Sequence, residues 1–175
     1  MKLSGSPMRE RFTRTIELPR PDGTSLPLTL RPLPLGYHAR LRERGIAPPA
    51  PPTRVARDSQ GRPIRDERTM AILVADENDP AHLAAVEQYH QRVAVLVVAE
   101  ALGADPRIEF ETAAPRDDRG WAEYADALYA ELADAGFSDG DLVRLCGEVC
   151  RMSNLLDDHL REAGRNFSST PPPTS

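Results

Sequence analysis

The sequence predicts a mainly α protein that begins with a β-hairpin. Three observations lead to this: apolar residues at helical spacing in the second half, period-two alternation near the start, and proline clusters between the two. The predicted fold is an N-terminal hairpin and short helix, a Pro-rich linker, and then a three-helix bundle-like module. The corresponding boundaries are 1–47 for hairpin and short helix, 48–69 for the Pro/Arg-rich linker or long loop, 70–167 for the helical domain, and 168–175 for a disordered tail.

The hairpin is predicted within residues 10–30, where two alternating runs flank the turn sequence PRPDGTS. Pro27 lies inside the second run, which restricts that strand to an edge or to partial pairing. A lone hairpin is only marginally stable, and its sequence leaves open whether it packs on the helices or stands free. The residues expected on one side are Phe12, Arg14, Ile16 and Leu18 in the first strand, and Leu26, Leu28 and Leu30 in the second.

A short helix is expected over residues 34–45, with Tyr37 and Leu41 on one face and Gly45 at its end. The following segment, 46–69, contains five prolines and many arginines. It shows no periodicity that would bury one face. We therefore expect a linker or long loop with local polyproline II geometry.

The clearest helix covers residues 79–103. Asp79 suits the N-cap, Pro80 suits the first helical position, and Gly103 closes the helix. Its stretch VAVLVVA is apolar nearly all round, which indicates a central helix. The apolar stripe consists of Leu83, Val86, His90, Val93, Val97 and Ala101, widened by Leu96.

Two further helices are expected in the last third of the chain. Gly136 is a left-handed terminator for the first, and Ser138 with Asp141 forms a capping box for the second. The first helix should bury Trp121, Tyr124 or Ala125, Leu128 and Leu132. The second should bury Leu142, Leu145, Cys146, Val149, Met152, Leu156 and Leu160.

This helix–turn–helix outline raises the question of DNA binding. Residues 1–70 carry 14 Lys/Arg against 7 Asp/Glu, whereas residues 120–164 carry 3 against 10. Because DNA affinity comes chiefly from basic side chains, the acidic segment would be repelled by phosphates. The outline is therefore interpreted as a corner between packed helices, and a DNA-binding regulator is kept only as an alternative.

The sequence contains no motif typical of nucleotide binding, metalloproteases, serine hydrolases or CxxC redox sites. We therefore expect no enzyme activity, no cofactor and no metal. Cys146 and Cys150 lie four residues apart and are interpreted as small buried hydrophobic residues. With no run of about 20 apolar residues and no secretory leader pattern, a cytoplasmic setting without membrane contact is expected.

The order of these elements resembles that of a known family. The segment LRPLPL with its following short helix, and ELADAGFSDGDL followed by NLLDDHLREAGRNF, are similar to segments of the tail assembly chaperones of long-tailed bacteriophages and prophages. The resemblance implies a non-enzymatic protein that coats the tape measure protein and recruits tail-tube subunits. The alternatives are a structural tail or head–tail component retained in the virion, a DNA-binding regulator, and an enzyme of unknown reaction.

A chaperone of this kind needs an apolar surface for its partner. The candidate contact residues are Trp121, Tyr124, Leu128 and Tyr129, together with Val95 and Val98. The alternative interpretation is that all six belong to the core. Self-association of the chain is a further expectation, and nucleic acid is not an expected partner.

Overall fold

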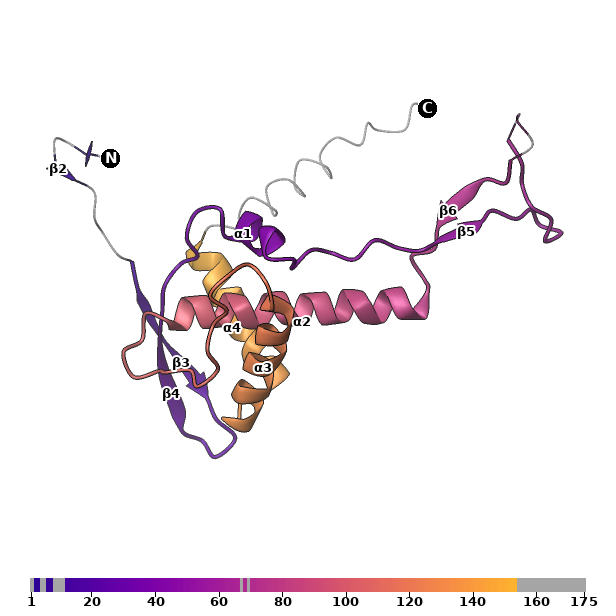
Figure 1. Cartoon of the computed structure of the whole chain (residues 1–175). Helices are drawn as coiled ribbons and strands as arrows, with labels where there is room; N and C mark the ends of the chain where they lie inside the picture. Colours follow the sequence, from indigo (N-terminus) through magenta and orange to yellow (C-terminus); the bar gives the residue numbers. More distant parts are fainter. Residues whose placement is uncertain (1, 4–5, 8–11, 67, 69, 154–175) are drawn as a thin grey trace, which may run out of the picture.

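The computed structural model describes residues 2–3, 6–7, 12–66, 68 and 70–153. Helices hold more residues than strands in this part of the chain, so the mainly α prediction is confirmed. Figure 1 shows a helical body with a long projection at one end. The elements are β1 (Lys2–Leu3), β2 (Ser6–Pro7), β3 (Arg14–Pro19), β4 (Ser25–Leu30), α1 (Tyr37–Glu43), β5 (Thr53–Val55), β6 (Leu73–Ala75), α2 (Pro80–Leu102), α3 (Trp121–Asp134) and α4 (Asp139–Met152).

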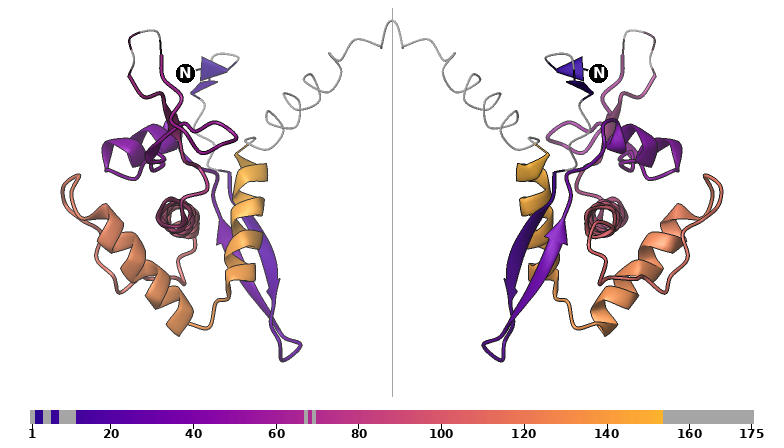
Figure 2. Two further views of the ribbon diagram at one scale, coloured as in Figure 1. Left: turned by 90° about the vertical axis from the view of Figure 1, so that its right-hand side faces the viewer. Right: turned by 90° about the vertical axis from the view of Figure 1, so that its left-hand side faces the viewer.

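Helix α2 is the central element, as predicted. Figure 2 shows it end-on, with α3 on one side and α4 with the β3–β4 hairpin on the other. Its cap is also as predicted, because the Asp79 side chain accepts a hydrogen bond from the backbone N–H of His82 at 2.9 Å. The buried residues all lie in its second half: Val95, Leu96, Val97, Val98, Ala101 and Leu102.

The predicted apolar stripe on α2 is therefore wrong for the first half of the helix. Leu83 is 52% exposed, and His90 is exposed as well. The reason lies in the packing: α3, α4 and β4 contact α2, and its buried residues begin only at Val95. The first turns of α2 project beyond the body toward the long extension (Figure 1).

The β3–β4 hairpin packs on the helices and does not stand free. Leu18, Leu28 and Leu30 are buried in the same core as the helices, and Ile16 packs against it opposite Leu28. Ion pairs link the hairpin to α4, for example Arg20 to Asp141 at 3.3 Å. The prediction of the inward side is confirmed for the leucines. Phe12 and Arg14, at the start of the first run, are exposed.

Helix α1 is anchored by the two residues predicted for its buried face, Tyr37 and Leu41. The Tyr37 hydroxyl donates a hydrogen bond to the backbone carbonyl of Leu96 in α2 at 2.6 Å. Gly45 follows the helix with a φ of 79°, a conformation that a residue with a side chain rarely adopts. Helix α1 is thus held on the central helix through one buried tyrosine.

The corner between α3 and α4 has the predicted chemistry. Gly136 adopts a φ of 83°, and Ser138 and Asp141 form the complete capping box. The buried residues of the two helices are Ala125, Leu128 and Leu132 in α3, and Leu142, Leu145 and Val149 in α4. The predictions for Leu156 and Leu160 and for a tail at 168–175 lie outside the described residues.

Residues 48–69 were predicted to be a Pro/Arg-rich linker or long loop, and the structure places a short strand, β5, within this range. Strand β5 pairs with β6 in an antiparallel register that joins Arg54 to Val74. We call the described residues from 53 to 75 the arm. The boundary expected after residue 69 falls inside it. Both strands are largely exposed, so the pairing depends on backbone hydrogen bonds and leaves no buried face for a sequence pattern to show.

Candidate protein-binding groove

A largely apolar depression of the body lies at the C-terminal end of α2, between the β3–β4 hairpin and the end of α3. Its volume is about 410 Å³. We call it the groove. Apolar side chains make up most of its lining, and three charged side chains complete it. The lining residues are Leu26, Pro27, Leu28, Leu102, Arg107, Ile108, Glu109, Phe110, Glu131, Leu132, Ala135 and Phe137.

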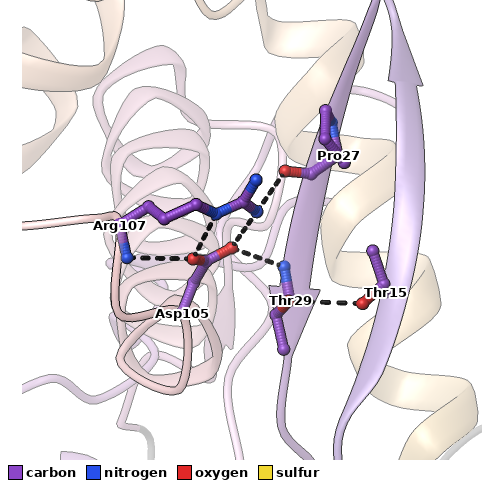
Figure 3. Close-up of polar contacts among 5 residues, drawn as sticks. All are labelled: Thr15, Pro27, Thr29, Asp105 and Arg107. Carbon is purple, nitrogen blue, oxygen red and sulfur yellow. Dashed lines mark hydrogen bonds and ion pairs between the residues drawn. The ribbon is translucent and has the colours of Figure 1, made fainter.

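One wall of the groove is held in place by Asp105, whose side chain is buried (Figure 3). Its Oδ2 accepts hydrogen bonds from the backbone N–H of Thr29 at 2.8 Å and from Nη2 of Arg107 at 2.6 Å. Its Oδ1 accepts from Nε of Arg107 at 2.9 Å. These bonds attach the loop after α2 directly to strand β4.

Arg107 completes this connection by donating from Nη2 to the backbone carbonyl of Pro27 at 2.6 Å. Hydrogen bonds from the Arg107 side chain, and then from the Thr29 backbone, hold the pKa of the Asp105 carboxyl well below its usual range. The carboxylate is therefore charged at neutral pH, and its partners satisfy it. The result is a rigid edge that presents the neighbouring Ile108 to the groove.

Glu131 of α3 fixes the other end of the same loop. Its carboxylate accepts hydrogen bonds from the backbone N–H groups of Glu111 at 2.7 Å and Thr112 at 2.9 Å. Burial acts to raise the pKa of Glu131, but the hydrogen bonds from Thr112 and Glu111 outweigh it and lower the pKa. Phe110 is held between these two anchors and packs against the core from the groove side.

A second depression, of about 550 Å³, adjoins the groove along α3. The two share Glu109, Glu131 and Ala135. The second is lined by small alanines and by four carboxylates, which we call the acidic shelf: Glu109, Glu111, Glu131 and Asp134. The combined surface therefore offers an apolar floor that continues into a negatively charged edge.

The predicted contact residues do not form this site. Val95, Val98 and Leu128 have no exposed area, so they belong to the core, and their assignment as contacts is corrected. The sequence allowed both interpretations. The core interpretation holds for these three residues because neighbouring elements cover the second half of α2 and the inner face of α3.

The three predicted aromatic residues are half-buried and lie elsewhere. Trp121 stacks under the Arg44 guanidinium, whose carbon is 3.7 Å from the ring centre, and it meets Tyr124 edge-on. Both line a small pocket of about 180 Å³ beside α1. Tyr129 donates a hydrogen bond to Asp139 at 2.8 Å. These aromatic rings thus serve contacts within the chain, and none lines the groove.

Sequence reasoning missed the groove residues of the loop after α2. This loop contains the segment 105–112, DPRIEFET. Its alternating Ile108 and Phe110 were the available signal, because two large apolar side chains in a polar loop need a surface to pack on. The partner surface comes from β4 and α3, which the loop pattern does not indicate.

The described residues contain no group of three or more side chains suited to hold a metal ion. Cys146 is half-buried and donates to the carbonyl of Ala94 at 3.5 Å. Burial raises the pKa of its thiol to about 11, which disfavours the reactive thiolate. Both cysteines are free and only partly buried, so the prediction of buried residues is confirmed only in part.

The α3–α4 corner is unsuited to phosphate contact. Helix α4 begins with Asp139 and Asp141, and the nearby Arg20 is already paired with Asp141. No helix in the described part of the chain is long and apolar enough to cross a membrane.

Comparison with protein-family models, curated proteins and solved structures finds no match to this chain. The groove is therefore interpreted from its own chemistry. Its volume falls within the range of about 300–1,000 Å³ typical of ligand pockets, and its walls are mainly apolar. Two of the three charged residues in its lining, Arg107 and Glu109, are exposed. Such a surface suits the apolar face of another polypeptide.

Proposed function

We propose that this chain is a tail assembly chaperone. In this proposal it binds an apolar helical segment of a tape measure protein in the groove and helps to recruit tail-tube subunits in the host cytoplasm. Helices α2, α3 and α4 act together as a bundle-like platform, and the docked hairpin supplies one wall of the site. The chain performs no chemistry on its partner.

The observation that supports this most directly is the apolar lining of the groove, from Leu26 and Leu28 on β4 to Phe110 and Phe137 opposite. An amphipathic helix inserts apolar side chains at spacings of three and four residues into such a groove. The fixed loop between Asp105 and Glu131 supports the same interpretation, since a preformed site loses less conformational entropy on binding.

The acidic shelf supports a preference among helices. Its carboxylates lie beside the apolar floor, so a partner helix with Lys or Arg next to its apolar stripe would be favoured. A tape measure chain exposes long apolar helical stripes until the tail tube surrounds it. Covering these stripes in the groove would keep such a chain soluble during assembly.

Co-expression with a candidate tape measure protein, chosen as a very long helix-rich chain, tests the proposal. We expect the partner to be soluble and to co-purify with the wild-type chain. Ala135→Arg places a charged side chain in the groove and should abolish co-purification. Ala133→Arg is the matched control, because Ala133 is exposed in the last turn of α3, two residues before Ala135, and does not line the groove. A partner that stays insoluble with the wild-type chain, or binds both variants equally, refutes the proposal.

A further inference from the structure

The arm carries the largest group of exposed apolar side chains in the described part of the chain. Met70 is 67% exposed and Leu73 is 61% exposed. Ile64, Ile72 and Val74 are also exposed. A two-stranded hairpin in water is marginally stable at best. Strand β6 carries no charged side chain, and such a strand favours pairing or docking. The exposed apolar side chains of the arm therefore favour packing against another surface.

The arm has a defined shape at its tip, which favours docking as a preformed unit. Three backbone hydrogen bonds of 2.8–3.0 Å close a ring, from Ala56 to Ile72, from Ile72 to Ile64 and from Ile64 to Ala56. Asp58 and Asp66 hold the two loops between these points by accepting from backbone N–H groups. The apolar residues around the ring are thus held together.

The arm cannot reach the groove of its own chain. It joins the N-terminal end of α2 (Figure 1). The groove lies at the other end of this helix, where Leu102, the last helical residue, lines it. Helix α2 has 23 residues, so at about 1.5 Å per residue the two sites are separated by about 35 Å along it. Any groove of this kind that the arm enters must belong to another molecule.

The charges of the arm and the groove are complementary. Residues 53–75 carry five arginines against three acidic residues, whereas residues 76–153 carry 6 arginines against 17 acidic residues. Arg54 and Arg62 remain more than half exposed on the arm although each has an acidic neighbour. An apolar surface with a basic surround thus matches the apolar groove and its acidic shelf.

We propose that the arm of one copy docks in the groove and acidic shelf of a second copy of this chain. Two copies placed side by side in opposite directions bring each arm to the other's groove. Both contacts then form at once in a symmetric dimer, which is the commonest oligomer symmetry. The arm and a tape measure segment would compete for one groove, and this last consequence rests on the proposed function.

The test uses the full chain without any partner protein, so its failure would leave the proposed function untouched. Leu73→Asp impairs the arm, and Ala135→Arg blocks the groove. Val143→Asp and Ala133→Arg are the controls, since Val143 is 73% exposed on α4 and Ala133 lies outside the groove lining. Sedimentation velocity gives the mass of each protein, and circular dichroism confirms that each variant is folded.

We expect the wild-type chain and both controls to form dimers that weaken as salt is raised. Leu73→Asp and Ala135→Arg should each self-associate at least about tenfold more weakly. Mixed together, these two variants should form a 1:1 heterodimer through one intact arm-to-groove contact, more tightly than either variant alone and less tightly than wild type. A monomeric wild-type chain, an Ala135→Arg chain that dimerises normally, or a mixture that stays monomeric overturns the proposal. Normal dimerisation of Ala135→Arg would indicate arm-to-arm pairing instead.

Discussion

Leu18→Ala tests whether the β3–β4 hairpin is docked in solution as the groove requires. Leu18 is 0% exposed and lies in the shared core of hairpin and helices. Removing its three outer carbons loses about 0.8 kcal/mol each in burial and leaves a cavity, so the free energy of unfolding should fall by about 3 kcal/mol. Urea unfolding followed by helical circular dichroism would show a midpoint lower by about 1.5 M, for a slope of about 2 kcal/mol/M.

Phe12→Ala is the control for this experiment. Phe12 precedes the same strand but is 60% exposed, so its truncation should change the free energy of unfolding by less than about 0.5 kcal/mol. A loss below about 1 kcal/mol for Leu18→Ala would mean that the hairpin is not packed on the helices. The groove would then lack the wall that Leu26 and Leu28 provide.

Three further predictions concern the loop, the corner and the thiol. The pKa of Asp105 is lower in the folded than in the unfolded chain, because the Arg107 side chain hydrogen-bonds to its carboxylate. The ionised Asp105 therefore stabilises the folded chain fully above about pH 5, and this contribution is lost as the pH falls through the folded-state pKa. Asp105→Asn should thus have a lower free energy of unfolding than wild type at pH 7. Urea unfolding should show the difference between the two proteins becoming smaller below about pH 4, and a difference that does not change with pH would contradict this prediction. Ser138→Ala should lower the free energy of unfolding by about 1 kcal/mol, since Ser138 accepts from the Asp141 N–H at 3.2 Å; no change would exclude the cap in solution. Cys146 should react with iodoacetamide at pH 8 far more slowly in the folded chain than in urea, as mass spectrometry would show, because burial raises its pKa to about 11; equal rates would refute its burial.

The sequence predicts the elements whose signals are local. Asp79 and Ser138 cap their helices as expected, and Gly136 ends α3, because each depends on residues within one turn. The hairpin was also predictable, since period-two alternation reflects a sheet with one buried face. The inward position of Leu28 and Leu30 follows from the same pattern.

The groove and the arm were not predictable, for different reasons. The groove is assembled from segments far apart, and its key bond joins Thr29 to Asp105 across 76 positions of the chain. No local pattern indicates such a contact. The arm has no buried face, so its strands lack the periodicity that reveals a strand. Val95 and Val98 were ambiguous because a helix that is apolar all round fits both a core and a binding surface.

Photo-crosslinking from the groove tests the central claim most directly. A photoreactive residue at position 135, just after α3, lines the groove, and one at position 133, in the last turn of α3, lies outside it. With the tape measure candidate present, we expect crosslinks to apolar helical segments of that protein from position 135 and few from position 133, as identified by mass spectrometry. Equal crosslinking from both positions, or none from position 135 while the partner stays bound, would contradict the assignment of the groove as the binding site.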